Sequence, residues 1–353
     1  MPRTNCSTMF LVLTNLVLFL ITSSPCFAQQ TGNGSVVALF AFGDSILDTG
    51  NNNNLLSGSK CNYPPYGKDF PGGRATGRWG NGRVFSEVLA EAVGVKTFLP
   101  PYLDPALPTG ELPTGVCFAS GGSGLDTATS SATQSIPMRE QLRYFQDYIG
   151  KLKGLVGEEK ANSILANSLA LISAGNNDMG IGRLASGRAV IGVDGYADLL
   201  MTFATDFVTQ LYNLGVRKVA FMSAIPGGCT PAGRAATGGL GCAGPNPFDG
   251  ASVYNTKLAG TMQALNSKLS GADIVYLDVY TPLLRISQNP LSYGFQNSMM
   301  GCCALLGPLC NIATQVTCPD RSKFVFWDSV HPTEAAYKAV IAQIQQKNGY
   351  KLF

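Results

Sequence analysis

Short runs of apolar residues recur along the chain, separated by longer segments with helical periodicity. The runs occupy residues 36–42, 115–119, 168–174, 218–225, 273–280 and 323–327. Unbroken apolar runs of this length are typical of strands that are covered on both faces, as in parallel sheets. The pattern therefore predicts a sheet whose strands are far apart in the sequence.

Two of the intervening segments place apolar residues at steps of three and four, which is the spacing of one helix face. The first stripe consists of Val84, Phe85, Val88, Leu89 and Ala92, and the second of Leu200, Phe203, Phe207, Leu211 and Leu214. Core packing explains both stripes. A last helix is expected near Pro332, because proline suits a first helical turn. This alternation predicts a three-layer α/β/α sandwich on a mainly parallel sheet.

The first residues have the layout of a secretory signal peptide. Arg3 precedes an apolar run at 9–21, and small residues surround a cleavage site after Ala28. The alternative is a membrane anchor, but the run is shorter than the roughly 20 apolar residues that a spanning helix needs. We therefore expect residues 1–28 to be removed and the protein to be secreted, without a stable membrane anchor. Residues 29–353 contain no internal repeat and no long linker, which predicts a single domain.

Charge excludes one class of partner. Only 13% of the residues are charged, the formal net charge is +3, and no cluster of Lys or Arg occurs. Because nucleic-acid binding relies on clustered positive charge, no nucleic-acid partner is expected.

The cysteines are expected to form disulfides, because an exported chain enters an oxidising compartment. Cys229 and Cys242 bracket a glycine-rich loop and form the most plausible local pair. Four more cysteines crowd a second loop and can form two further bridges, with a bond between adjacent neighbours the least plausible: Cys302, Cys303, Cys310 and Cys318. A zinc site is disfavoured, because the chain has one histidine and no C-x-x-C pair. The sequon at Asn33 predicts N-glycosylation.

Polar and glycine residues follow four of the predicted strands. They are Ser45, the Gly121–Gly122 pair, Asn177, and Asp328 with His331. Because ligands of open parallel sheets bind beyond the carboxyl ends of the strands, we expect these residues to converge. Each group alone has an ordinary explanation as a turn or helix cap. Their joint occurrence after separate strands points to a site.

Acyl transfer needs these groups. The Ser45 hydroxyl becomes a nucleophile when a base removes its proton, and His331 is the only histidine available. Asp328, three residues earlier, can orient the imidazole ring. The amides of Ser45 and Gly121 and the side chain of Asn177 can serve as an oxyanion hole. The sequence thus predicts a serine hydrolase that needs no metal or other cofactor.

Four segments resemble the blocks of the GDSL/SGNH hydrolase family. They are FGDSILDTGNN (42–52), GVCFASGGSG (115–124), ISAGNND (172–178) and VFWDSVHPTEAAY (325–337). The stretch at 61–84 is similar to the plant extracellular branch of that family. The resemblance implies a flavodoxin-like fold and hydrolysis of carboxylic esters, with acyl lipids or other small or polymeric esters as substrates.

The resemblance assigns Ser45, Gly121, Asn177 and His331 to the four blocks, with Asp328 completing the triad. Ile46 and Cys117 depart from the residues usual in the family, and the sequence leaves open whether Gly121 or Gly122 donates to the oxyanion. Two other functions remain possible. One is an acyltransferase that uses the same triad, and the other is a secreted binding protein without catalysis.

Overall fold

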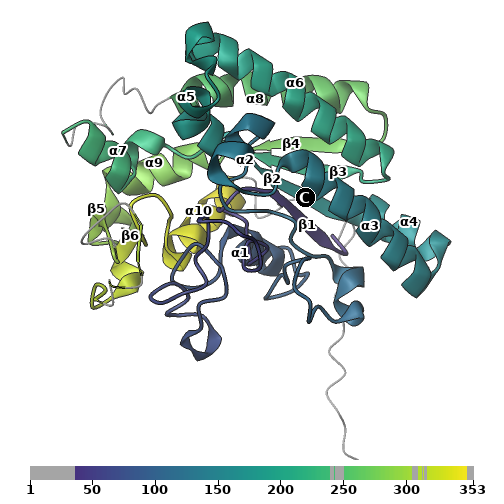
Figure 1. The fold of residues 1–353 in the computed structure, drawn as a ribbon, viewed down its shortest axis with the longest axis horizontal. Helices are drawn as coiled ribbons and strands as arrows, with labels where there is room; N and C mark the ends of the chain where they lie inside the picture. The colour runs from purple at the N-terminus through teal and green to yellow at the C-terminus, as the bar shows by residue number, and fades with distance from the viewer. Residues whose placement is uncertain are drawn as a thin grey trace, which may run out of the picture. The chain divides into compact units, whose positions relative to one another are not determined.

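The central sheet contains four parallel strands, and each comes from one of the predicted apolar runs (Figure 1). In spatial order they are β1 (Leu39–Gly43), β2 (Leu169–Ser173), β3 (Lys218–Met222) and β4 (Asp273–Leu277). The strands are in register, so that Gly43 pairs with Ser173 and Ser173 with Met222 at the carboxyl edge. This register brings the residues that follow β1 and β2 to the same edge of the sheet.

Two of the apolar runs take other positions. Residues 115–119 run beside β1, where the Phe118 amide donates to the Ala41 carbonyl at 2.7 Å, but they form no named strand and pair only as isolated bridges through Cys117, to Ala41 and to Pro101. The last run forms β6 (Phe324–Phe326), which pairs with β5 (Asn297–Gly301) in a separate two-stranded parallel sheet. The last run is therefore not a strand of the central sheet.

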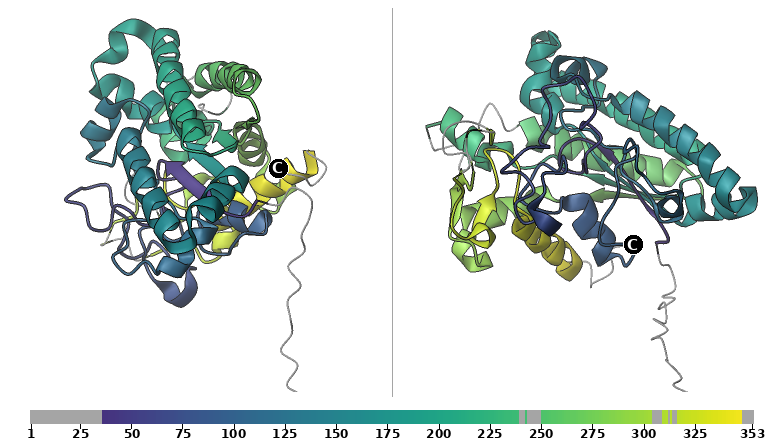
Figure 2. Two further views of the ribbon diagram at one scale, coloured as in Figure 1. Left: turned by 90° about the vertical axis from the view of Figure 1, so that its right-hand side faces the viewer. Right: turned by 60° about the horizontal axis from the view of Figure 1, so that its bottom comes forward.

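Alternate residues of each central strand face two different helical layers, which bury both faces of the sheet. On one face, Phe40 and Phe42 pack against α3 (Met138–Val156), α6 (Gly192–Asn213) and α8 (Gly250–Lys268). On the other face, the core contains residues of α1 (Phe85–Ala92), α9 (Tyr280–Gln288) and α10 (Glu334–Lys347). In Figure 1, α6 and α8 lie above the strands and α1 and α10 lie below them, and Figure 2 shows the same elements from two other sides. These layers confirm the predicted α/β/α sandwich.

Shorter helices lie in the segments between these elements. They are α2 (Thr127–Thr133), α4 (Glu158–Asn167), α5 (Arg183–Ala185) and α7 (Pro231–Ala236). The predicted stripes at 84–92 and 200–214 belong to α1 and α6, and their buried members lie in the core. The last helix begins at Glu334, two residues after Pro332.

This computed structural model describes residues 36–238, 242, 250–303, 309–311, 313 and 316–347. The expected signal peptide at 1–28 and the sequon at Asn33 lie outside these residues. Within the described residues, no helix has both the length and the apolar character needed to cross a membrane.

Candidate active site

Ser45 lies just beyond the carboxyl end of β1, in a turn that the backbone of β2 holds in place. Gly43 has a φ of 118°, and a Cβ at this position would come within 1.8 Å of the Ser173 carbonyl oxygen. Glycine is therefore required there. The next amide, from Asp44, donates to the same carbonyl at 2.9 Å. The chain leaves the strand sharply and presents Ser45 at the sheet edge.

The residues predicted to form a triad lie in one hydrogen-bonded line. Ser45 Oγ lies 2.8 Å from His331 Nε2, and His331 Nδ1 lies 2.8 Å from Asp328 Oδ2. Asp328 is completely buried and His331 is 5% exposed. Residues 286 positions apart in the sequence thus meet at one point, as their places after separate strands predicted.

Asp328 is held as a carboxylate by several donors. Its Oδ1 atom accepts hydrogen bonds from the amides of Val330 and His331, at 2.8 and 2.7 Å. Its Oδ2 atom accepts a hydrogen bond of 2.9 Å from the hydroxyl of Tyr66. Although burial opposes ionisation, the adjacent His331 and the two amide donors lower the pKa of Asp328 below its usual value. The carboxylate can therefore orient the imidazole and stabilise its positive charge.

A second buried carboxylate supports the turn at Ser45. Asp44 accepts hydrogen bonds from Ser173 Oγ (2.9 Å), Asn176 Nδ2 (2.8 Å) and the Ile46 amide (3.1 Å). Complete burial raises its pKa to about 6 despite these donors. Asp44 thus joins the segment after β1 to the segment after β2.

The loop after residue 119 corrects one detail of the expected oxyanion hole. The Gly121 amide donates to the buried Asp48 Oδ2 at 2.8 Å, so it already has an acceptor. Gly122, with a φ of 91°, lines the cavity beside Ser45, and its amide has no acceptor within the described residues. The amide of Ser45 likewise has none among the described residues. The structure therefore favours Gly122 over Gly121 as the glycine donor.

Asn177 approaches the same loop from the end of β2. One N–H of its side-chain amide donates to the Ser123 carbonyl at 2.8 Å. Because a carboxamide carries two N–H groups, the other remains for a ligand. The next residue, Asp178, accepts hydrogen bonds from the amides of Leu125 and Asp126 at 2.9 and 3.0 Å. Asp48 and Asp178 therefore hold the two ends of the loop at 121–126, the expected oxyanion loop.

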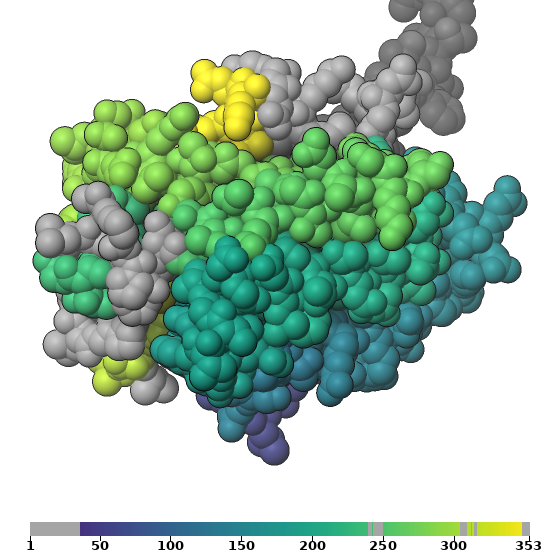
Figure 3. All heavy atoms as spheres, turned by 90° about the horizontal axis from the view of Figure 1, so that it is seen from above, coloured from purple at the N-terminus to yellow at the C-terminus, as the bar shows by residue number. Residues whose placement is uncertain are grey.

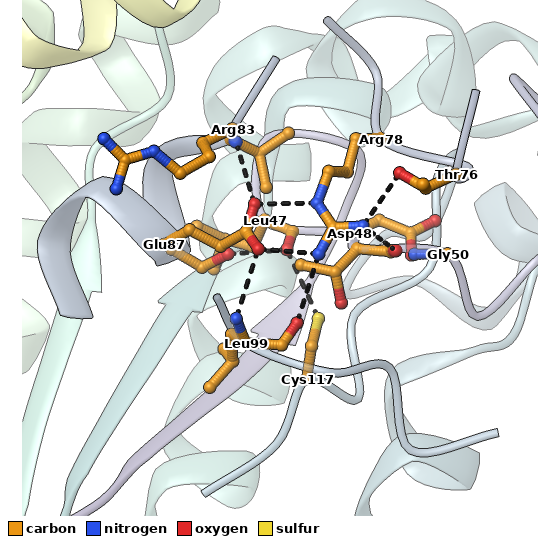
Figure 4. A network of polar contacts seen from close by, with 12 residues as sticks. Leu47, Asp48, Gly50, Thr76, Arg78, Arg83, Glu87, Leu99 and Cys117 are labelled. Atoms are coloured by element: carbon orange, nitrogen blue, oxygen red, sulfur yellow. Dashed lines mark hydrogen bonds and ion pairs between the residues drawn. The ribbon is translucent and has the colours of Figure 1, made fainter. Parts of the chain in front are cut away.

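A buried ion pair lies beside the segment that carries Asp48 (Figure 4). Arg78 Nη2 lies 2.6 Å from Glu87 Oε1, and the guanidinium also donates to the Thr49 carbonyl at 3.0 Å. On the other side, the buried thiol of Cys117 donates to the Leu47 carbonyl at 3.2 Å. In this chain Cys117 thus fixes the turn after Ser45 by its own hydrogen bond.

A cavity of about 440 Å³ opens at Ser45 and His331. Most of its lining is apolar, and includes Ile46, Met179, Ile181, Ile225, Ala251 and Leu309. Its volume falls in the range of pockets for small ligands. A larger cavity of about 630 Å³ near Arg74 and Phe98 includes none of the predicted site residues. The apolar cavity is therefore the one that connects to the triad.

Three disulfides are present among the described cysteines. Cys229 is bonded to Cys242, Cys302 to Cys318, and Cys303 to Cys310. The adjacent Cys302 and Cys303 are not joined to each other, as expected. Cys61 and Cys117 are free and buried. No group of three or more His, Cys, Asp or Glu suited to a metal ion occurs within the described residues.

The sequence did not point to several residues that contact the site. Tyr66 and Trp79 come from the long segment between β1 and α1, and Trp79 lies beside His331 with ring centroids 5.1 Å apart. Asp48 and Asp178 belong to the resembling blocks, but their hydrogen bonds run to a loop far away in sequence. A pattern of residue types along the chain carries no signal for such contacts.

Comparison with known proteins identifies relatives over almost the whole chain. The family model described as GDSL-like Lipase/Acylhydrolase matches residues 39–344. GDSL esterase/lipase At1g23500 of Arabidopsis thaliana is 46% identical over 341 residues, covering 96% of each chain. GDSL esterase/lipase EXL3 of the same plant is 44% identical over 319 residues, covering 88% of this chain and 87% of its own.

Proposed function

Because the chain belongs to the family of GDSL-like lipases and acylhydrolases, and is thereby a carboxylic ester hydrolase, we propose that Ser45, His331 and Asp328 form its catalytic triad. The observation that carries this proposal is the unbroken hydrogen-bonded line from Ser45 Oγ through the imidazole to Asp328. A serine next to a base that a carboxylate orients is the arrangement that acyl transfer requires.

The proposed reaction proceeds through an acyl-enzyme. His331 Nε2 takes the proton of Ser45 Oγ as that oxygen attacks the ester carbonyl carbon. The tetrahedral intermediate then collapses, its bond to the alcohol oxygen breaks, and His331 gives the proton to the leaving alcohol. A water molecule next loses a proton to His331 and attacks the acyl carbon. Release of the acid returns the proton to Ser45.

The amides of Ser45 and Gly122 and the free N–H of Asn177 supply the proposed oxyanion hole. All three residues line the cavity at the triad. Fixed donors of this kind stabilise the negative charge that develops on the carbonyl oxygen in the transition state. The hydrogen bonds from Gly121 to Asp48 and from Asn177 to Ser123 support this role, because they fix the loop on both sides.

The apolar lining favours an acyl chain as the part of the substrate that enters the cavity. We infer that activity extends beyond acetate. Purified wild type and Ser45→Ala should be compared on p-nitrophenyl esters of increasing acyl length. We expect wild type to hydrolyse medium-chain esters faster than acetate, and the variant to be inactive on all of them. Equal activity of the variant would overturn the triad.

Transfer to an alcohol other than water remains the second candidate, because the acyl-enzyme is common to both reactions. The same assay with an added primary alcohol distinguishes the two. A hydrolase yields mainly the free acid, and a transferase yields mainly the new ester.

We further infer that the protein is secreted after cleavage behind Ala28 and is glycosylated at Asn33. The three disulfides support an oxidising compartment. Sequencing the N-terminus of protein from the culture medium should find Gln29 first, and a mass decrease after glycosidase treatment should map to Asn33. Retention of residues 1–28 would contradict the cleavage.

A further inference from the structure

Tyr66 contacts the carboxylate of the triad, although the reaction proposed above assigns it no part. Its hydroxyl donates to Asp328 Oδ2 at 2.9 Å, and the same oxygen faces His331 Nδ1 at 2.8 Å. Tyr66 is 1% exposed. Tyrosine and imidazole thus share one buried carboxylate oxygen, where water does not compete.

The surrounding aromatic residues fix both partners. Trp79 packs edge-on to Tyr66, with centroids 5.8 Å apart, and its ring lies 5.1 Å from the ring of His331. Burial raises the pKa of the Tyr66 hydroxyl well above its usual value, so the group remains a donor over any practical assay range.

We propose that Tyr66 is a positioning residue that sets the pH at which His331 becomes a base. This proposal rests on the proposed triad. A donor to Asp328 Oδ2 draws negative charge away from the imidazole, so its removal leaves a carboxylate that stabilises imidazolium more strongly. Without the hydroxyl, His331 should lose its proton only at higher pH.

Other titratable groups also face the Asp328–His331 pair. They are Asp44 beyond β1, Tyr337 on α10, and Cys61 and Tyr63 on the same segment as Tyr66. Because all of them remain when one hydroxyl is removed, a matched pair of variants isolates the effect of Tyr66. Tyr63→Phe is that match, since the Tyr63 hydroxyl donates to the Cys310 carbonyl and not to Asp328.

The test measures kcat/KM against pH on a soluble p-nitrophenyl ester for wild type, Tyr66→Phe and Tyr63→Phe. We expect the acid limb of Tyr66→Phe to move up by about 0.5 to 1 pH unit, which corresponds to one hydrogen bond. Tyr63→Phe should keep the wild-type limb. A loss of activity in Tyr66→Phe with an unmoved limb would show a merely structural role and overturn the proposal.

A second readout does not depend on catalysis. His331 is the only histidine in the chain, so one imidazole Cε1–H resonance reports its titration by NMR, even in the Ser45→Ala background. The same upward shift is expected there, and its absence contradicts the proposal even if the triad is wrong. Tyr66→Met, a second variant without the hydroxyl, replaces Tyr66→Phe if the latter does not fold.

A separate observation concerns the segment at 179–193, which begins at the cavity and continues onto the surface. Ile181 lines the cavity and is also 53% exposed. Beyond it, Leu184, Val190 and Ile191 are 65%, 90% and 47% exposed. Ile181 and Leu184 are three residues apart in consecutive helical turns, and such a spacing places side chains on one face. In Figure 3, the teal segment that contains α5 faces the viewer.

The charge of this segment distinguishes between possible partners. Residues 179–193 contain Arg183 and Arg188 but no acidic residue; Arg188 forms an ion pair with the buried Asp126, and Arg183 forms none among the described residues. Exposed apolar residues beside basic ones are typical of segments that lie on lipid surfaces. A protein bound here would cover the mouth of the cavity and obstruct the substrate, whereas a lipid surface would deliver it.

We propose that Ile181, Leu184, Val190 and Ile191 form an apolar rim that contacts the surface of acyl-lipid aggregates. An acyl chain then passes from that surface along Ile181 into the cavity without crossing water. This inference rests on the proposed function and narrows its substrate to aggregated acyl lipids.

The test compares the double variant Leu184→Gln/Val190→Gln with Leu155→Gln, which changes an exposed leucine near the end of α3. Binding to phosphatidylcholine vesicles with anionic lipid is measured by flotation, and hydrolysis is measured on soluble p-nitrophenyl acetate and on an emulsified long-chain ester. We expect the double variant to lose vesicle binding and at least about fivefold of its activity on the emulsion, while its acetate activity stays unchanged.

Leu155→Gln should match wild type in every assay. The proposed rim is overturned if the double variant binds vesicles and hydrolyses the emulsion as well as wild type does. It is also overturned if wild type forms a dimer and the double variant is a monomer. A protein inactive on both substrates would instead contradict the proposed function.

Discussion

The hydrogen bond from Gly121 to Asp48 allows the oxyanion loop to be perturbed without touching any group that meets the substrate. Asp48 Oδ1 accepts hydrogen bonds from the amides of Gly50 and Asn51, and Oδ2 accepts one from Gly121. In Asp48→Asn, the amide oxygen can retain the first two. The new NH₂ group then faces the Gly121 N–H, donor against donor. The peptide between Ser120 and Gly121 must shift, and the next peptide, which carries the Gly122 N–H, shifts with it.

Two opposing effects on stability are expected at neutral pH. Leaving the buried Gly121 N–H without an acceptor costs about 1–3 kcal/mol. Against this, burial raises the pKa of Asp48 from 3.8 to about 6, and such a shift corresponds to roughly 3 kcal/mol against the charged form. In wild type this cost is absent below the unfolded pKa near 4 and fully present above about pH 6. Asp48→Asn removes it, so the net change at pH 7 should be small.

Activity should respond much more than stability. A displaced Gly122 amide weakens one oxyanion donor, whose complete loss typically lowers kcat by about 10²–10³. We expect Asp48→Asn to lower kcat by about 10-fold to 100-fold, with KM little changed. Stopped assays on a short-chain ester and urea unfolding at pH 7 measure both quantities.

Glu87→Gln is the matched control, because it changes another buried acid that lies in the ion pair with Arg78 rather than at the oxyanion loop. Breaking a buried pair should cost about 3–5 kcal/mol of stability. The folded Glu87→Gln variant should nevertheless retain a kcat within about threefold of wild type. This decrease is far smaller than the one caused by losing an oxyanion donor. A wild-type kcat in Asp48→Asn would refute the role of Asp48 in placing the oxyanion loop.

Three further predictions concern the third oxyanion donor, the triad and the disulfide between Cys229 and Cys242. Asn177→Ala should lower kcat by about 10²–10³ with little change in KM, and an unchanged kcat removes Asn177 from the oxyanion hole. His331→Ala should abolish nearly all turnover together with the acid limb of the pH profile. Asp328→Asn should fold but lose most activity, because the imidazole ring loses its orienting acceptor. Either variant contradicts the triad if it keeps the wild-type acid limb and rate. Replacing Cys229 and Cys242 by serine should lower the free energy of unfolding by about 3 kcal/mol in urea titrations, and unaltered stability contradicts a structural role for that bond.

The fold could be predicted from the sequence where burial imposes a simple pattern. The strands of the central sheet are covered on both faces, so each appears as a continuous apolar run. The same signal misplaced two runs. Residues 115–119 are equally apolar and hydrogen-bond to Ala41 of β1, but the amide of Cys117 donates to the Pro100 carbonyl, and the pairing with β1 is limited to an isolated bridge. The partner of β6 is β5, whose residues NSMMG have no strand-like pattern.

The convergence of the site residues could be predicted, because it follows from the order of the strands in the sequence. Ser45, Asn177 and His331 each follow a predicted strand, and the structure brings them together. Whether Gly121 or Gly122 faces the cavity depends on backbone dihedral angles, which a glycine pair does not reveal. Tyr66 belongs to a long irregular segment where neither period nor spacing indicates what a side chain will touch. These contacts depend on tertiary packing.

In the proposed reaction, the Ser45 oxygen carries the acyl group. A fluorophosphonate reacts with a serine hydroxyl only where a base and an oxyanion hole activate it, so it labels the nucleophile covalently. Wild type and Ser45→Ala should be incubated with the probe, digested and mapped by mass spectrometry. We expect one adduct, on the peptide that contains Ser45, and no adduct in the variant. Labelling at another residue, or labelling that persists in Ser45→Ala, would contradict it.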